Sequence, residues 1–147
     1  MSFTNPSQRL KESTRLLTRK LGFLERDEAV CCGVTLTQCH VIVETGRKQK
    51  ISVNELAELL NLDKSTVSRT VDQLVNNGSL IREADPDDRR YVMLRLDLKG
   101  EELFKNIEQR MDIYFTETLE SIPEEKRKQV IEGLEIFSEM LKNIKCI

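Results

Sequence analysis

The chain has 147 residues, of which 39% are hydrophobic and 33% are charged, and its formal net charge is −2. This composition is typical of one soluble domain, and it excludes a protein that binds nucleic acid through bulk basicity. Positive charge for such a role must be local, because charges separated by more than a Debye length of about 10 Å are screened. No apolar run approaches the roughly 20 residues of a membrane span, and the N-terminus does not resemble a signal peptide, so we expect a cytoplasmic protein.

The first third of the chain predicts two helices. Apolar residues at helical spacing indicate the first of them over residues 4–28. The sequence Cys-Cys-Gly at 31–33 interrupts this pattern, and we expect it to lie between the two helices. The second helix is expected to start at Thr35, since Gln38 follows at the spacing of a capping box, and to end at Gly46.

Two shorter helices with a tight connection follow. Ser52 and Asp63 are the expected caps, because their side chains can accept a hydrogen bond from the backbone of the first turn. The second of these helices buries one apolar face, and Asn77-Gly78 supplies the left-handed residue that ends it. The apolar residues of that face recur at helical spacing and are Val67, Val71 and Leu74.

After this helix the apolar period changes from 3.6 to 2, which predicts two β-strands joined by a polar turn. The strands are SLIRE at 79–83 and YVMLRL at 91–96. In the second strand one side is expected to carry Val92, Leu94 and Leu96. The order of two helices and a hairpin predicts a winged helix-turn-helix. The expected fold class is therefore mainly α with a small β-hairpin wing, plus N- and C-terminal dimerisation helices.

The outward face of the fourth helix suits a reader of the major groove. Short side chains allow close approach, Arg can bind guanine O6 and N7, and Gln is suited to adenine. An ordinary solvated helix face is the alternative, and the hairpin that follows makes it the weaker one. The candidate DNA-binding residues of this helix are Lys64, Ser65, Thr66, Ser68, Arg69 and Gln73.

The turn ADPDDRRYV at 84–92 places Arg89 and Arg90 side by side at the tip of the hairpin. Such a tip can reach the adjacent minor groove, where the electronegative potential favours guanidinium groups. Three aspartates in the same turn would repel phosphate if all of them pointed outward. We therefore expect Asp88 to turn toward an arginine and orient it, because a bidentate carboxylate fixes the guanidinium. The alternative is a solvated charged turn without a role.

The helices that flank this lobe carry apolar stripes that point to dimerisation. We expect a homodimer in which residues 1–30 and 98–147 form the dimerisation helices around a DNA-binding lobe at 35–97. The alternative is an intramolecular bundle in a monomer. In the last helix the stripe consists of Val130, Leu134, Phe137, Leu141 and Ile144.

With the stretch LNLDKSTVSRTVDQLVNNGSLIREADPDDRRYVMLRLDLKG, the chain resembles the MarR family of winged-helix transcriptional regulators over nearly its whole length. The Asp-x-Arg signature of the wing is present at Asp88 and Arg90. The resemblance implies a single MarR-type domain over 1–147, an obligate homodimer, a pseudo-palindromic double-stranded DNA site and, usually, repression. It also implies a small-molecule ligand or an oxidant as effector. Ser79 departs from the family, which usually has a hydrophobic residue there.

The stretch CCGVTLTQCH brings Cys31, Cys32, Cys39 and His40 within ten residues. Three interpretations stay open. In the first, they are core residues and incidental thiols, since buried cysteine is common. In the second, they form a thiol sensor near a helix N-terminus. In the third, they bind a soft metal, although adjacent cysteines do not match the usual spacing of metal ligands.

Two other classes of function compete with a DNA-binding regulator. For an enzyme the sequence lacks a Gly-rich phosphate loop and a plausible Ser–His–Asp set, so we expect no catalytic residues and no cofactor. A winged helix used only for protein contacts would not need two arginines at the tip of its wing. It is kept as the alternative, together with a soft-metal-responsive regulator.

Overall fold

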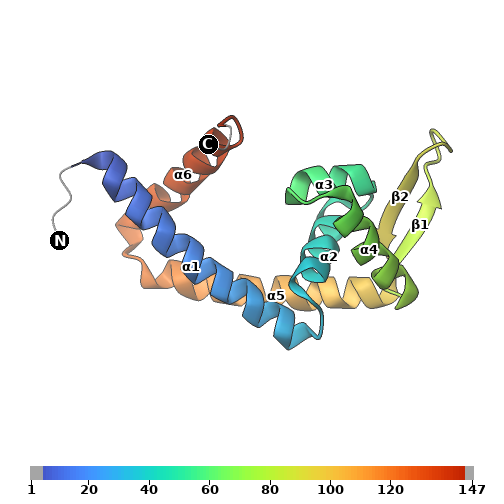
Figure 1. Cartoon of the computed structure of the whole chain (residues 1–147). Helices are drawn as coiled ribbons and strands as arrows, with labels where there is room; N and C mark the ends of the chain where they lie inside the picture. Colours follow the sequence, from blue (N-terminus) through green and yellow to red (C-terminus); the bar gives the residue numbers. More distant parts are fainter. Residues whose placement is uncertain (1–4, 145–147) are drawn as a thin grey trace. The chain divides into compact units, whose positions relative to one another are not determined.

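The structure is a computed structural model that describes residues 5–144; within its first helix, the side chains of residues 23–32 are not described. Six helices and one antiparallel pair of strands make up this part of the chain (Figure 1), which confirms the expected mainly helical fold with one hairpin. In chain order they are α1 (Pro6–Cys32), α2 (Leu36–Lys48), α3 (Val53–Leu60), α4 (Lys64–Asn76), β1 (Leu80–Ala84), β2 (Val92–Leu96), α5 (Leu98–Ser121) and α6 (Glu124–Leu141).

The chain divides into two compact units at residues 108 and 109. The first unit contains α1 to α4, the hairpin and the first part of α5. The second contains the rest of α5 and α6. Among the described residues, no helix is both long enough and apolar enough to span a membrane.

The helix starts follow from the capping residues that the sequence predicts. Thr35 and Gln38 form a reciprocal capping box, in which each side chain accepts a hydrogen bond from the other residue's backbone N–H, at 3.2 and 3.1 Å. Ser52 Oγ accepts from the backbone of Glu55 at 3.1 Å, and Asp63 accepts from the backbone of a residue in the first turn of α4. Each cap satisfies one of the N–H groups that a helix leaves without an internal partner.

Two helix ends differ from the prediction. The Cys31-Cys32 pair does not lie between helices but in the last turn of α1, and the break comes at Gly33, whose φ is +72°. Gly46 does not end α2, which continues to Lys48. A Cβ atom on Gly46 would lie 2.6 Å from the ring of Phe104 in α5. This glycine therefore serves close packing and not helix termination.

The hydrophobic core of the first unit lies between α2, α3, α4 and the hairpin, which Figure 1 shows grouped together. The predicted inner face of α4 is fully buried, and Ile51 extends the hairpin by pairing with Leu94 through hydrogen bonds of 3.1 and 2.7 Å. Burying one such side chain contributes about 1.5–3 kcal/mol. The core residues include Val41, Ile42, Ile51, Leu56, Val67, Val71, Leu74, Leu80, Leu94 and Ile107.

The side of β2 that carries Val92, Leu94 and Leu96 is buried only in part. Leu94 and Leu96 are buried, but Val92 is 49% exposed. Val92 pairs with Ala84 at the end of the hairpin next to the wing turn.

The hairpin and α5 meet at a tight contact between Ser79 and Gly100. Ser79 is fully buried, and its carbonyl oxygen accepts a hydrogen bond of 2.8 Å from the backbone of Asp97. A Cβ atom on Gly100 would collide with that oxygen. The Ser79 hydroxyl has no hydrogen-bond partner among the described residues. The unusual serine is therefore buried, and its hydroxyl oxygen is unsatisfied among the described residues.

Candidate nucleic-acid interface

Helix α4 presents a hydrophilic face opposite its buried side. The structure brings all six predicted residues of this helix to that face or its border. Val67, Thr70, Val71 and Leu74 form the buried side, and Thr70 is the one that the sequence pattern did not predict. Lys64, Ser65, Arg69 and Gln73 are exposed, and Thr66 and Ser68 are half-buried.

Asp63 organises the first turn of α4. Its carboxylate accepts hydrogen bonds from the hydroxyl of Ser65, from the hydroxyl of Thr66 at 2.7 Å and from the backbone N–H of Thr66 at 3.0 Å. A guanidinium nitrogen of Arg69 donates in turn to Thr66 Oγ1 at 3.5 Å. The Ser65 hydroxyl, followed by the Thr66 hydroxyl and N–H, holds the pKa of Asp63 well below its ordinary value of 3.8. The sequence predicted Asp63 only as a cap, and not as an acceptor for two hydroxyl groups on the candidate DNA-binding face.

Two contacts reach the exposed face of α4 from other elements. The Gln38 amide in α2 donates to the side-chain oxygen of Gln73 at 3.2 Å. Arg82 in β1 forms an ion pair with Asp72. Sequence spacing did not predict either contact, because the partners are 35 and 10 residues apart and lie on different elements.

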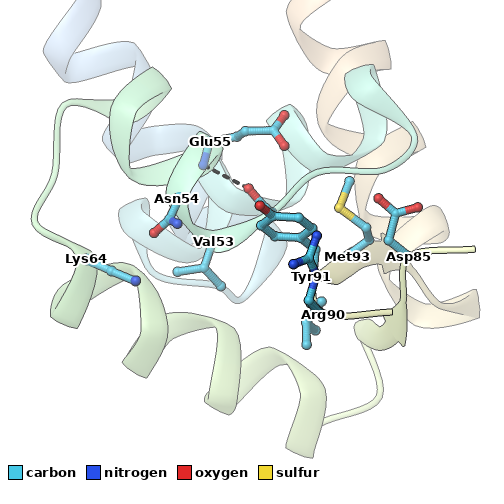
Figure 2. Close-up of a pocket in the computed structure, with 10 residues that line it drawn as sticks. Val53, Asn54, Glu55, Lys64, Asp85, Arg90, Tyr91 and Met93 are labelled. Atoms are coloured by element: carbon cyan, nitrogen blue, oxygen red, sulfur yellow. Dashed lines mark hydrogen bonds between the residues drawn. The ribbon is translucent and has the colours of Figure 1, made fainter. Parts of the chain in front are cut away.

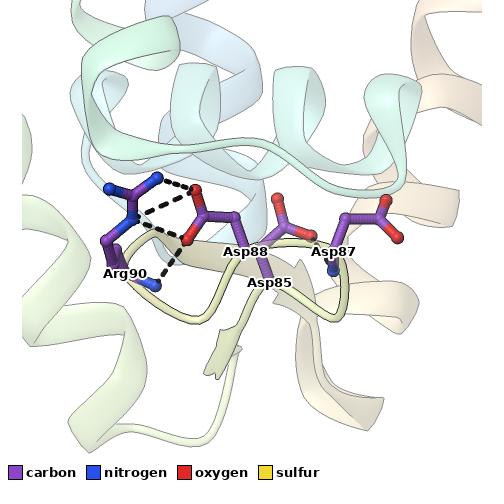
Figure 3. A network of polar contacts seen from close by, with 4 residues as sticks. All are labelled: Asp85, Asp87, Asp88 and Arg90. Atoms are coloured by element: carbon purple, nitrogen blue, oxygen red, sulfur yellow. Dashed lines mark hydrogen bonds and ion pairs between the residues drawn. The ribbon is translucent and has the colours of Figure 1, made fainter.

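The wing turn contains the carboxylate–arginine contact that the sequence predicts (Figure 3). The Asp88 carboxylate accepts from Arg90 Nε at 3.0 Å, from its terminal nitrogen at 2.7 Å and from its backbone N–H at 3.1 Å. Arg90 thereby lowers the pKa of Asp88, and Asp88 raises the pKa of Arg90. Asp85 shapes the turn instead, since its side chain accepts from the backbone N–H of Asp87 at 3.0 Å. Arg90 nevertheless keeps 85% of its side chain exposed.

A groove of about 450 Å³ lies between the start of α4 and the wing turn with the adjoining part of β2 (Figure 2). Lys64 from α4 and Arg90 from the wing both line it, so the two basic elements border one space. The start of α3 closes it with Val53 and Asn54, and the wing adds Tyr91. Residues that are distant in sequence thus border one groove, whose lining includes two basic residues, Lys64 and Arg90, and two acidic ones, Glu55 and Asp85.

The structure describes the side chains of only part of the predicted cysteine cluster. Cys39 is 7% exposed in α2, and His40 beside it is half-buried. The side chains of Cys31 and Cys32 lie outside the described residues. Within the described part of the chain, no group of three or more His, Cys, Asp or Glu residues could hold a metal ion. The burial of Cys39 agrees with a core residue, while the thiol-sensor and soft-metal interpretations stay predictions.

The sequence is similar to known regulators. Residues 33–90 match the model of the MarR family. The chain is 24% identical over 116 residues to the uncharacterized HTH-type transcriptional regulator YdgJ of Bacillus subtilis, which covers 79% of this chain and 71% of YdgJ. It is 29% identical over 98 residues to the HTH-type transcriptional regulator BilQ of Clostridium symbiosum, with 67% and 68% covered.

Solved structures share the fold. A MarR family protein from Bacillus stearothermophilus gives a TM-score of 0.84 at 20% identity, covering 97% of this chain and 99% of the other. Streptococcus pneumoniae FabT in complex with DNA gives a TM-score of 0.81 at 19% identity, with 95% and 99% covered. At these identities the likeness concerns the fold, and it includes the arrangement of helices and hairpin described above.

Proposed function

Because this chain belongs to the MarR family of DNA-binding transcriptional regulators and is not an enzyme, we propose that its homodimer binds a pseudo-palindromic double-stranded DNA site as a cytoplasmic repressor. A small-molecule ligand or the oxidation of a thiol releases the repressor from DNA. The observation that carries the proposal is that Lys64, at the start of the hydrophilic helix α4, and Arg90 of the wing border the same groove.

In this proposal, α4 lies in the major groove. Arg69 is the candidate for a bidentate contact with guanine, and Gln73 is the candidate for adenine. The short side chains around them let the helix backbone approach the base edges, and the lysine contacts a phosphate. These further contacts come from Lys64, Ser65, Thr66 and Ser68.

The wing contributes Arg89 and Arg90 to the adjacent minor groove. The bidentate contact with Asp88 restricts the Arg90 guanidinium before DNA arrives, so less conformational entropy is lost on binding. A guanidinium group suits this groove because it meets a negative potential there.

Exposed apolar residues support the dimer. In the single chain, large apolar side chains stay open to solvent along α1, α5 and α6, and burying each of them would contribute about 1.5–3 kcal/mol. A two-fold dimer would also place two α4 helices about 34 Å apart, one turn of DNA. The exposed residues include Leu10, Leu16, Ile113, Phe115, Val130, Ile131, Leu134, Ile136, Met140 and Leu141.

Binding of a labelled DNA duplex, selected from a random pool, tests the proposal. The logarithm of the affinity should fall linearly with the logarithm of the salt concentration, with a slope of about −0.9 for each phosphate neutralised. Arg69→Ala and Arg90→Ala should each weaken binding at least about tenfold. Lys128→Ala on α6 is the matched control and should change little. A flat salt response with wild-type binding in both arginine variants would instead favour a module for protein contacts.

The cysteines are the candidate effector site. Cys39 follows directly after Gln38, whose amide contacts α4, so a change at the start of α2 has a short route to the DNA-binding face. Replacement of Cys31, Cys32 and Cys39 by serine should abolish DNA release by peroxide or by zinc while leaving binding intact. Release that survives this triple change would make the cluster structural and would point to a non-thiol ligand.

A further inference from the structure

Helix α4 contains one acidic residue, Asp72, on the face that the proposed function turns toward DNA. Its side chain is 58% exposed, and its carboxylate forms an ion pair with Arg82 of β1. A carboxylate at this place is unexpected, because it would repel the phosphates on either side of the groove. The structure therefore raises the question of how a DNA-binding face tolerates a negative charge.

We propose that Arg82 is the dedicated counterion of Asp72, and that this pairing, not a contact of Arg82 with DNA, makes Arg82 necessary for DNA binding. The inference deepens the proposed function and rests on it. Arg82 is accordingly a positioning and neutralising residue that acts through Asp72. The wing thereby takes part in DNA binding through its strand as well as through its tip.

The charge balance of α4 gives the reason. Lys64, Arg69 and Asp72 together give this helix a net charge of +1, and Arg82 supplies the positive charge that offsets Asp72. Without Arg82, the carboxylate cancels half of the attraction that the two basic side chains supply. As DNA covers this surface, it displaces water and salt, so a lone carboxylate then becomes more costly than it is in the free protein.

Because the Arg82–Asp72 ion pair is exposed, its proposed role in DNA binding can be distinguished from a role in folding. The two side chains keep 41% and 58% of their surface open, and ion pairs of this kind contribute little to folding stability. Arg82 is also well placed on the hairpin, since its Cα lies opposite that of the buried Leu94. Its backbone is therefore anchored at the centre of the strand pair while its side chain reaches α4.

The next charged residue on β1 follows the same arrangement. Glu83 pairs with Arg95 of β2 at 2.8 Å. Among the described residues of β1, both charged side chains are thus matched with an opposite charge, one toward α4 and one within the hairpin. Of Arg82 and Arg95, it is Arg82 that forms an ion pair with α4.

A double-mutant cycle on the full-length chain tests the inference. Binding of a fluorescent duplex that carries the selected site is measured for wild type, Arg82→Ala, Asp72→Asn and the double variant. Arg82→Ala alone should weaken binding about tenfold, the order expected for one unpaired charge near a phosphate under partial screening. Asp72→Asn alone should bind as tightly as wild type or more tightly. The double variant should recover to within about threefold of wild type, and Arg82→Lys should retain most of the affinity.

Two results would overturn the inference. Arg82→Ala could lower the DNA affinity by the same factor in wild type and in the Asp72→Asn variant. That result would mean that Arg82 contacts DNA itself. A loss confined to the specific site in Asp72→Asn would mean that Asp72 reads a base, such as the amino group of cytosine. Arg69→Ala is measured in parallel, and circular dichroism checks that each variant is folded. If Arg69→Ala weakens binding while the cycle shows no coupling, this inference fails alone; if wild type does not bind DNA, the proposed function fails.

Discussion

Asp63 has a depressed pKa because its carboxylate accepts hydrogen bonds from Ser65 and Thr66. A carboxyl group whose pKa is lower in the folded than in the unfolded state stabilises the fold above its ordinary pKa of 3.8, and this contribution is lost as the pH falls through the lower folded value. We therefore expect the melting temperature of wild type to fall more steeply below about pH 4 than that of Asp63→Asn. Thermal melts by circular dichroism from pH 7 to pH 2 measure this, and parallel curves would contradict it.

Ser79 offers a test of the unsatisfied buried hydroxyl. Ser79→Ala removes that hydroxyl without adding volume and should raise the free energy of unfolding by about 1 kcal/mol. Gly100→Ala is the opposite case at the same contact, because its Cβ would collide with the Ser79 carbonyl oxygen; it should lower the free energy of unfolding by at least about 1 kcal/mol. Chemical denaturation measures both changes. A loss of stability in Ser79→Ala would show that the hydroxyl has a partner, such as a bound water molecule.

Between elements, Gln38 joins the start of α2 to the exposed face of α4. One amide serves both contacts: its oxygen accepts from Thr35 and its nitrogen donates to Gln73. Gln38→Ala should therefore release the Gln73 side chain and lower the ratio of specific to non-specific DNA affinity several-fold. Thr35→Ala is the matched control, since it weakens the cap by about 1 kcal/mol but leaves Gln38 in place. Equal specificity ratios in the two variants would mean that Gln38 acts only as a cap.

The elements also indicate which features local sequence determines. Thr35, Ser52 and Asp63 predicted the helix starts correctly, because a cap depends on residues within one turn. The Asp88–Arg90 contact could also be predicted from the sequence, since the two residues are two positions apart. The end of α2 could not be predicted in this way, because the close packing at Gly46 depends on Phe104, far along the chain.

The partners of Asp72 and Gln73 were missed for the same reason. Sequence periodicity places Gln73 on the outward face of α4, and the structure leaves both Asp72 and Gln73 exposed there. It does not reveal which side chain from another element reaches them, because that depends on how α2 and β1 pack against α4. For this chain the sequence therefore identified the surface, while the structure supplied the contacts that hold its side chains in place.

For the whole molecule, the exposed apolar residues of α6 lead to a prediction about assembly. Leu134 is 44% exposed in the single chain. If it lies in the dimer interface, Leu134→Asp places two carboxylates in that interface and should raise the dimer dissociation constant at least about a hundredfold. Light scattering after size exclusion measures the mass, and DNA binding should fall with it. Lys128→Asp introduces the same side chain at an exposed charged position of α6 and should remain dimeric; an unchanged Leu134→Asp dimer would place the interface elsewhere.

The Ser65 hydroxyl donates its only proton to Asp63 in a hydrogen bond. Toward DNA it can therefore act only as a hydrogen-bond acceptor, through its lone pairs. Lone pairs match hydrogen-bond donors, and in the major groove the base donors are the exocyclic amino groups of adenine and cytosine. The base opposite Ser65 in the preferred operator should accordingly be adenine or cytosine. Asp63→Ala would release the hydroxyl proton, and guanine or thymine should then become acceptable at that one position.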